Sequence, residues 1–121
     1  MEPFRTGDLE VGIVESDDPP RIFLLCVGRS IEREPRPTLG AFLAGVVTHA
    51  GTRGANVELR CQQLTYLNSA TIACLVEFIR TCAQHSVRLT IQYDATSAWQ
   101  RSCFNALQVF AKDDRLTLVE A

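Results

Sequence analysis

The chain of 121 residues has the length of one ordinary domain, and its content of 46% hydrophobic and 21% charged residues is typical of a domain that buries a core. Its formal net charge of −2 gives no basis for a nucleic-acid-binding surface, since such surfaces usually concentrate positive charge. Without an apolar run of membrane-spanning length or the layout of a signal peptide, the sequence predicts a single cytoplasmic domain over residues 1–121, with 1–8 flexible.

The first predicted elements are two strands. In residues 9–13 apolar and polar residues alternate, which predicts a half-buried strand. Residues 16–20 (Ser-Asp-Asp-Pro-Pro) favour a turn, because their side chains bond locally and proline fixes φ. Residues 21–27 are almost wholly apolar and predict a central strand, whereas 28–37 are charged, contain two prolines and predict a loop.

A helix is predicted next. From Leu39 to Ala50 apolar residues recur at intervals of three and four, which is the helical pattern. Gly51 and Gly54 are expected to end this helix, because glycine readily takes the left-handed conformation of a helix C-terminus. Residues 57–61 then alternate again and predict a strand with one polar face.

The second half of the chain repeats this alternation of helix and strand. A helix is predicted from the pair Asn68-Ser69 to about Gln84, since apolar residues recur there at helical spacing. Residues 87–93 alternate like residues 57–61 and predict another strand with one polar face.

The last predicted helix opens at Ser97, which forms an S-x-x-Q capping-box pattern with Gln100. One face of this helix is expected to be buried. Its aromatic residues, Phe104 among them, are expected to belong to the core and not to a ligand site, and an outward position of Phe104 is the alternative. The residues expected on the buried face are Trp99, Cys103, Ala106, Leu107 and Phe110. The acidic pair at 113–114 predicts a turn, and residues 116–118 mark a last strand.

The predicted order is ββαβαβαβ, and each β-α-β step is expected to be a right-handed crossover between parallel strands. In a doubly wound sheet, helices cover both faces and the strands are continuous apolar runs. Here three of the later strands have one polar face, so all helices are expected on one face of a mainly parallel sheet. The predicted fold is therefore a single-domain α/β fold that is not of the Rossmann type.

No motif for enzyme chemistry is present. The phosphate-binding patterns G-x-G-x-x-G and G-x-x-x-x-G-K-[ST] are absent, as is the G-x-S-x-G turn of serine hydrolases. His49 and His85 lie near the ends of separate predicted helices, and the acid pairs 17–18 and 113–114 fall in predicted turns. These positions disfavour a Ser-His-Asp set and paired catalytic carboxylates. We predict no catalytic residue, no cofactor and no enzyme activity.

The five cysteines match neither a disulfide framework nor a metal site. No two are spaced as C-x-x-C, their number is odd, and each lies where a small apolar residue would fit. A zinc site would need cysteine and histidine clustered at short spacing. We predict core thiols and no metal.

Residues 64–72 join the C-terminal end of a predicted strand to the first turn of a helix. Ligand and partner sites of parallel sheets gather at this edge, and the first helical turn has unpaired N–H groups and a partial positive charge. A phosphate on a hydroxyl there would carry about −1.5 to −2 charges, which is suited to switching a protein interface. The alternative is that Asn68 or Ser69 only caps the helix, since both residue types are favoured N-caps.

Residues 21–120 resemble the bacterial anti-sigma-factor-antagonist-like family (STAS domains) in the predicted strand order and in the junction around Asn68-Ser69. The matching family segment reads hydrophobic-Asp-Ser-Ser-Gly, and its first serine aligns with Ser69. This chain departs from that pattern at Asn68, Ala70 and Thr71. The Tyr-Leu-Asn-Ser sequence at 66–69 is closer to relatives that regulate enzymes producing cyclic-di-GMP.

The resemblance implies a β-α superhelix and a non-enzymatic role in partner switching. It implies that a serine/threonine protein kinase, which is also the binding partner, phosphorylates Ser69, and that a cognate phosphatase reverses this; Thr71 is an alternative acceptor. The output would be a diguanylate cyclase or a sigma-factor pathway. The expected partner-binding residues are Tyr66, Asn68, Ser69, Ala70 and Thr71.

Two other functions stay open from the sequence. The domain would be a phosphorylation-independent scaffold or oligomer subunit with a degenerate fold if Ser69 were only a helix cap. It would be a small-nucleotide-binding domain if the same sheet edge held a nucleotide, although no glycine-rich loop is present.

Overall fold

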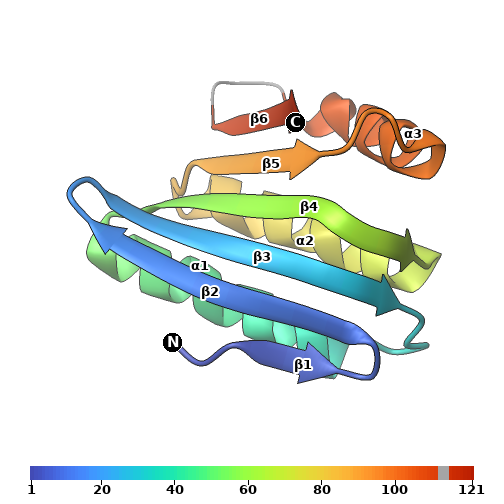
Figure 1. Cartoon of the computed structure of the whole chain (residues 1–121). Coiled ribbons are helices and arrows are strands. Elements are labelled where there is room, and N and C mark those ends of the chain that lie inside the picture. Colours follow the sequence, from blue (N-terminus) through green and yellow to red (C-terminus); the bar gives the residue numbers. More distant parts are fainter. Residues whose placement is uncertain (112–114) are drawn as a thin grey trace.

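The computed structural model of the protein describes residues 1–111 and 115–121. In these residues six strands form one sheet in the order β1-β2-β3-β4-β5-β6, and three α-helices pack against it (Figure 1). The strands are β1 (Phe4–Thr6), β2 (Leu9–Asp17), β3 (Pro20–Ser30), β4 (Asn56–Leu67), β5 (Leu89–Tyr93) and β6 (Leu116–Glu120). The helices are the short π-helix η1 (Arg36–Gly40), α1 (Ala41–Arg53), α2 (Ser69–Gln84), α3 (Ala98–Leu107) and the 3-10 helix η2 (Gln108–Phe110).

The sheet is mainly parallel, as predicted. β3, β4, β5 and β6 pair in parallel, and each of these pairs is connected through a helix, because parallel neighbours need a crossover. β1, β2 and β3 are antiparallel. Within residues 1–8, which the sequence predicts to be flexible, β1 pairs with β2 from Phe4↔Val11 to Thr6↔Leu9.

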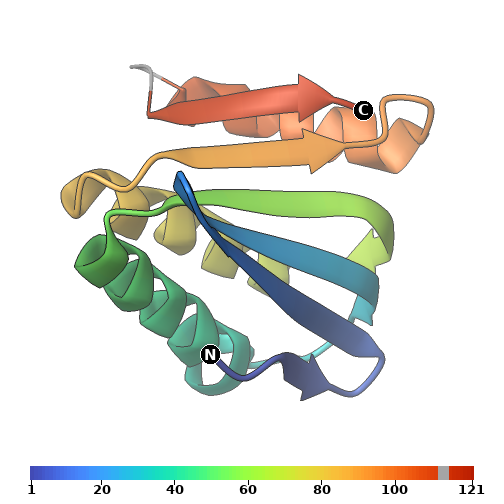
Figure 2. The ribbon, with the colours of Figure 1, turned by 60° about the vertical axis from the view of Figure 1, so that its left-hand side comes forward.

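The two faces of the sheet differ in what covers them. In β4, Val57, Leu59 and Cys61 are at most 1% exposed, whereas the alternating residues Glu58 and Arg60 on the other face are only half-buried. Turning the molecule by 60° shows that α1, α2 and α3 all lie on the same side of the sheet (Figure 2). The prediction that all helices pack on one face is confirmed.

α1 and α2 bury apolar stripes against this face. The buried residues of α1 are Leu43, Val46, Val47 and Ala50, and those of α2 include Cys74, Leu75, Phe78, Ile79 and Cys82. α1 is capped by Gly54, whose φ of +63° is left-handed and whose N–H bonds the carbonyl groups of the last turn. Gly54 therefore ends the helix as predicted, whereas Gly51 lies inside it.

β4 is longer than predicted because the spacing of its buried residues changes. Buried residues follow every second position up to Cys61 and every third position from there, at Leu64 and Leu67. The pairing with β3 shifts twice over the same stretch, and each shift places one extra residue in β4. Such bulges bend a strand and break its alternation, and so the predicted strand stopped at the first of them.

Other local predictions are also corrected. The predicted loop at 28–37 contributes its first three residues to β3 and its last two to η1. Phe104 is fully buried, which confirms its place in the core and excludes the outward alternative. The capping box is wrong, because Ser97 makes no side-chain cap bond and Gln100 turns its side chain into the core. The predicted turn at 113–114 lies outside the described residues.

Candidate functional site

Asn68 holds the junction between β4 and α2. It is the N-cap of α2, and its Oδ1 accepts hydrogen bonds from the backbone N–H of Thr71 at 2.9 Å and from the Thr71 hydroxyl at 2.7 Å. Its Nδ2 donates to the carbonyl oxygen of Glu32 at 2.8 Å. Because an amide is both acceptor and donor, this one side chain connects the start of α2 to the loop that follows β3.

A buried pair of hydroxyl groups extends this cap into the core. The Thr71 hydroxyl donates its only proton to Asn68, so it accepts from the hydroxyl of Ser30, whose oxygen lies 2.5 Å away. Thr71 and Ser30 are 1% and 2% exposed. Ser30 ends β3, and thus the network fixes the ends of β3 and β4 against the first turn of α2.

Ser69 is the first residue of α2, and it is exposed. The N–H of Ile72 bonds the carbonyl of Asn68, which is the first intrahelical bond, so the N–H groups of Ser69 and Ala70 precede the hydrogen-bonded turns. These groups and the helix dipole give this end of α2 a partial positive charge. The Ser69 hydroxyl is therefore reachable from solvent and lies where an added negative charge is tolerated.

The five residues predicted to bind a partner lie in different environments. Tyr66 is 49% exposed, Ser69 is exposed, and Asn68 and Ala70 are partly buried. Thr71 is enclosed, and its hydroxyl is committed to Asn68 and Ser30. The expectation that Thr71 contacts a partner or accepts a phosphate is therefore corrected.

An apolar residue that no sequence pattern predicted also lies at this edge. Ile31 is 55% exposed and directly follows Ser30, which pairs with Leu67. Ile31 and Tyr66 therefore lie at the same edge of the sheet as Ser69. In the sequence Ile31 falls within a charged stretch that predicts a loop, and no pattern distinguishes it there.

Gln100, which the sequence placed in a helix cap, instead lies in the core. It is 1% exposed, its Nε2 donates to the carbonyl oxygens of Cys61 at 2.9 Å and Leu64 at 3.0 Å, and its Oε1 accepts from the N–H of Asp94 at 2.8 Å. The ladder between β4 and β5 ends with Arg60, so these two carbonyl groups lie beyond it. Gln100 satisfies them where the bulged β4 diverges from β5.

Other kinds of site find no support in the described residues. Over residues 1–111 and 115–121, no three His, Cys, Asp or Glu side chains are grouped so that they could hold a metal ion. No helix in the same residues has the length and apolar character needed to span a membrane. All five cysteines are free thiols, and burial raises the pKa of Cys82 to about 12, which keeps this thiol protonated and unreactive at neutral pH.

No family model matches the chain, and no curated protein matches its sequence. Its structure is similar to that of the anti-sigma factor antagonist SpoIIAA in its unphosphorylated form, with a TM-score of 0.57 and 11% identity, over 93% of this chain and 88% of that chain. The chain has a SpoIIAA-like fold. An uncharacterised protein from Shewanella loihica with a SpoIIAA-like fold is similar too, with a TM-score of 0.55 and 12% identity, over 97% of this chain and 89% of that chain.

The SpoIIAA-like fold confirms the fold class that the family resemblance implied from the sequence. At identities of 11% and 12% the similarity describes the architecture of the chain. The similarity therefore assigns no role to an individual residue.

Asn68 bridges α2 and the loop after β3 through its hydrogen bond to the Glu32 carbonyl oxygen. This bridge can be tested with Asn68→Asp, which introduces the residue of the family motif. We expect a loss of about 1 kcal/mol in the free energy of unfolding, because the carboxylate keeps the cap but faces the Glu32 carbonyl without a donor. Asn68→Ala is expected to lose about 2 kcal/mol, since it removes the cap as well. Urea unfolding measures both, and an Asn68→Asp protein as stable as the parent would show that the bridge contributes nothing.

Proposed function

We propose that this protein is a non-enzymatic regulator of a bacterial partner-switching system that acts in the cytoplasm. In its unmodified form it binds a serine/threonine protein kinase of the anti-sigma type or another effector. Phosphorylation of Ser69 by that kinase weakens the complex, and a cognate phosphatase restores it.

The observation that supports this proposal best is the position of Ser69. An exposed hydroxyl begins α2, at the edge of the sheet where Tyr66 and Ile31 present apolar surface. The fold is that of an anti-sigma factor antagonist described in its unphosphorylated form. Ser69 aligns with the first serine of the family segment, and this alignment and the shared fold together favour Ser69 as the phosphoacceptor.

The size of the electrostatic effect favours a switch of binding over a switch of fold. A phosphate at the end of α2 gains about 0.3–1 kcal/mol from the helix dipole, which is too little to reorganise a domain. The same charge of about −1.5 to −2 placed within a protein interface must be desolvated or repelled, and this costs several kcal/mol of affinity. The modification therefore acts on the complex and leaves the domain folded.

The output of the switch is proposed from the motif. The sequence 66–69 is closer to relatives that regulate enzymes producing cyclic-di-GMP, which favours a diguanylate cyclase as the downstream partner. A component of a sigma-factor pathway is the alternative.

The site is tested by incubating the protein with the serine kinase encoded beside it and ATP, and mapping the phosphate by mass spectrometry. We expect a single phosphate on Ser69 and no labelling of Ser69→Ala. Ser102→Ala is the matched control, because Ser102 is also an exposed helical serine but lies on α3. Labelling of Ser69→Ala to the extent of the parent would reject Ser69 as the acceptor.

The switch itself is tested by measuring the affinity of the kinase for Ser69→Asp and Ser69→Ala. We expect Ser69→Asp to bind about tenfold to a hundredfold more weakly than the parent, because the added charge lies in the interface, whereas Ser69→Ala keeps its affinity. Equal affinity of Ser69→Asp and the parent would instead identify a phosphorylation-independent scaffold.

A further inference from the structure

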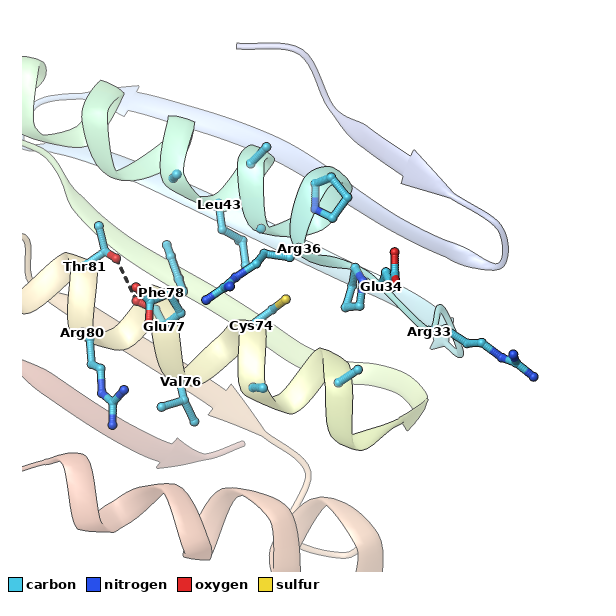
Figure 3. A pocket seen from close by; sticks show the side chains of 17 residues that line it. Arg33, Glu34, Arg36, Leu43, Cys74, Val76, Glu77, Phe78, Arg80 and Thr81 are labelled. Atoms are coloured by element: carbon cyan, nitrogen blue, oxygen red, sulfur yellow. Dashed lines mark hydrogen bonds between the residues drawn. The ribbon is translucent and has the colours of Figure 1, made fainter.

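A groove runs between the η1–α1 segment and α2, on the side of the helices that faces away from the sheet (Figure 3). Its volume is about 960 Å³. Leu43 of α1 and Cys74 and Phe78 of α2 line its apolar floor, and we call it the α1–α2 groove. Ala70 belongs to its lining, so the groove begins next to Ser69.

Small residues keep this groove open. On one wall Ala41 and Ala44 are exposed, and on the other wall Ala73 is exposed. Because alanine side chains are short, they leave the space above the floor of the groove unfilled. The lined part of α2, from Ala70 to Thr81, is about 16 Å long, or three helical turns.

One cation lies inside the groove. Figure 3 shows Arg36 extending from η1 between Leu43 and Cys74. The charge of Arg36 acts on the Cys74 thiol, where it opposes the rise in pKa caused by burial. Within the described residues no acidic group lies within ion-pair distance of Arg36, although Glu77 lines the same groove.

The other arginines of the groove point elsewhere. The Arg80 guanidinium lies over the ring of Phe110, 5.8 Å from its centroid. Arg33 lies at the end of the groove and points away from it (Figure 3). Of the arginines in the lining, Arg36 is therefore the one that extends over the apolar floor, where an occupant would contact it.

The walls of the groove favour a helical occupant over an extended peptide. They are mostly helices, whose backbone groups are bonded within each helix, so they offer no strand edge to an extended peptide. A helix satisfies its own backbone and needs only side-chain contacts, and an apolar stripe with spacing i, i+3, i+4 and i+7 fits such a floor.

We propose that the α1–α2 groove binds an amphipathic helix of a partner protein, which places apolar residues on the floor and a carboxylate on Arg36. This deepens the proposed function, on which it rests for the identity of the partner. Because Ser69 directly precedes Ala70, which lines the groove, a phosphate on Ser69 would repel an acidic helix and weaken its binding. The groove thus connects the switch to its partner.

A display library of amphipathic helical peptides, each of about four turns, tests the groove without any kinase. The apolar face is kept constant, and the flanking positions are randomised among Glu, Gln and Lys. We expect selection on the intact protein to enrich Glu over Lys by about tenfold or more, because a carboxylate pairs with Arg36. A selected pool with no preference for Glu would overturn the proposal.

Variants then locate the binding site of the selected peptide by fluorescence anisotropy. Ala73→Trp fills the groove from an exposed helix position and is expected to abolish binding, and Arg36→Glu is expected to weaken it about tenfold or more. Arg21→Glu is the matched control, because Arg21 is an exposed arginine at the start of β3, outside the groove, and it should leave the affinity unchanged. Circular dichroism verifies that each variant is folded.

Two further outcomes would overturn the proposal. Peptide binding that survives Ala73→Trp would place the peptide elsewhere, and self-association of the protein that is lost in Ala73→Trp would assign the groove to a second copy of this chain. Failure of the Ser69 labelling experiment leaves the peptide result intact, since no kinase takes part in it. If Ser69→Glu binds the peptide about tenfold more weakly than the parent does, the groove and the switch are coupled.

Discussion

Replacing Gln100 by leucine is expected to lower the free energy of unfolding by about 4 kcal/mol, although leucine is similar in size and apolar. The substitution leaves the carbonyl groups of Cys61 and Leu64 and the N–H of Asp94 without their partner. Each buried polar group left unpaired costs about 1–3 kcal/mol. Urea unfolding measures the loss, and faster amide exchange at Asp94 would show where it arises.

Gln92→Leu is the matched control for this experiment. Gln92 is half-buried and its side chain accepts one hydrogen bond, from Gln62 at 2.9 Å. Its replacement is expected to lower the free energy of unfolding by less than about 1 kcal/mol, because Gln62 and Gln92 both lie on the uncovered face of the sheet. If Gln100→Leu lost no more stability than Gln92→Leu, the role of Gln100 at the end of β4 would be rejected.

Gly28→Ala is the second substitution with a large expected effect, about 3 kcal/mol or more in the free energy of unfolding. Gly28 has a φ of +99°, which side-chain-bearing residues rarely adopt, and a Cβ built there would lie 1.9 Å from the carbonyl oxygen of Asp8. That oxygen accepts a hydrogen bond from the N–H of Arg29. The methyl group therefore forces backbone to move against backbone.

Gly51→Ala is the opposite control. Gly51 lies in the last turns of α1, and a Cβ there would have no neighbour within 4 Å. Alanine favours the helix over glycine by about 0.5–1 kcal/mol, so this variant is expected to be more stable than the parent. Unfolding midpoints that fall equally in Gly28→Ala and Gly51→Ala would contradict the argument from backbone geometry.

Both large effects concern the same part of the molecule. Gly28 is at a register shift between β3 and β4, two residues before Ser30, and Gln100 binds β4 near its bulges. The hydroxyl of Ser30 in turn contacts that of Thr71, in the same first turn of α2 as the exposed Ser69. The surface that carries the proposed switch is therefore held in place by strand irregularities and by a buried glutamine.

Much of the fold could be read from local patterns. The strands at 9–13, 21–27 and 57–61 and the helix after Asn68 were predicted because a half-buried element repeats its apolar residues at its own period. The polar faces of the later strands also predicted that the helices cover one side only. The same pattern placed the start of a helix at Asn68-Ser69, whereas the structure shows that Asn68 is the cap and that Ser69 is exposed.

The tertiary structure decided the features that depend on partners distant in sequence. From the sequence, Gln100 could cap a helix or could be a buried side chain that bonds backbone groups. Which role it takes depends on where the bulges of β4 leave carbonyl groups unpaired. Thr71 follows the accessible Ser69 by only two residues, yet its side chain is buried and its hydroxyl bonds that of Ser30 in β3. Local periodicity predicts which face of a helix or strand is apolar and buried. The burial of a polar group depends instead on hydrogen bonds from segments distant in sequence, and only the folded chain brings those segments together.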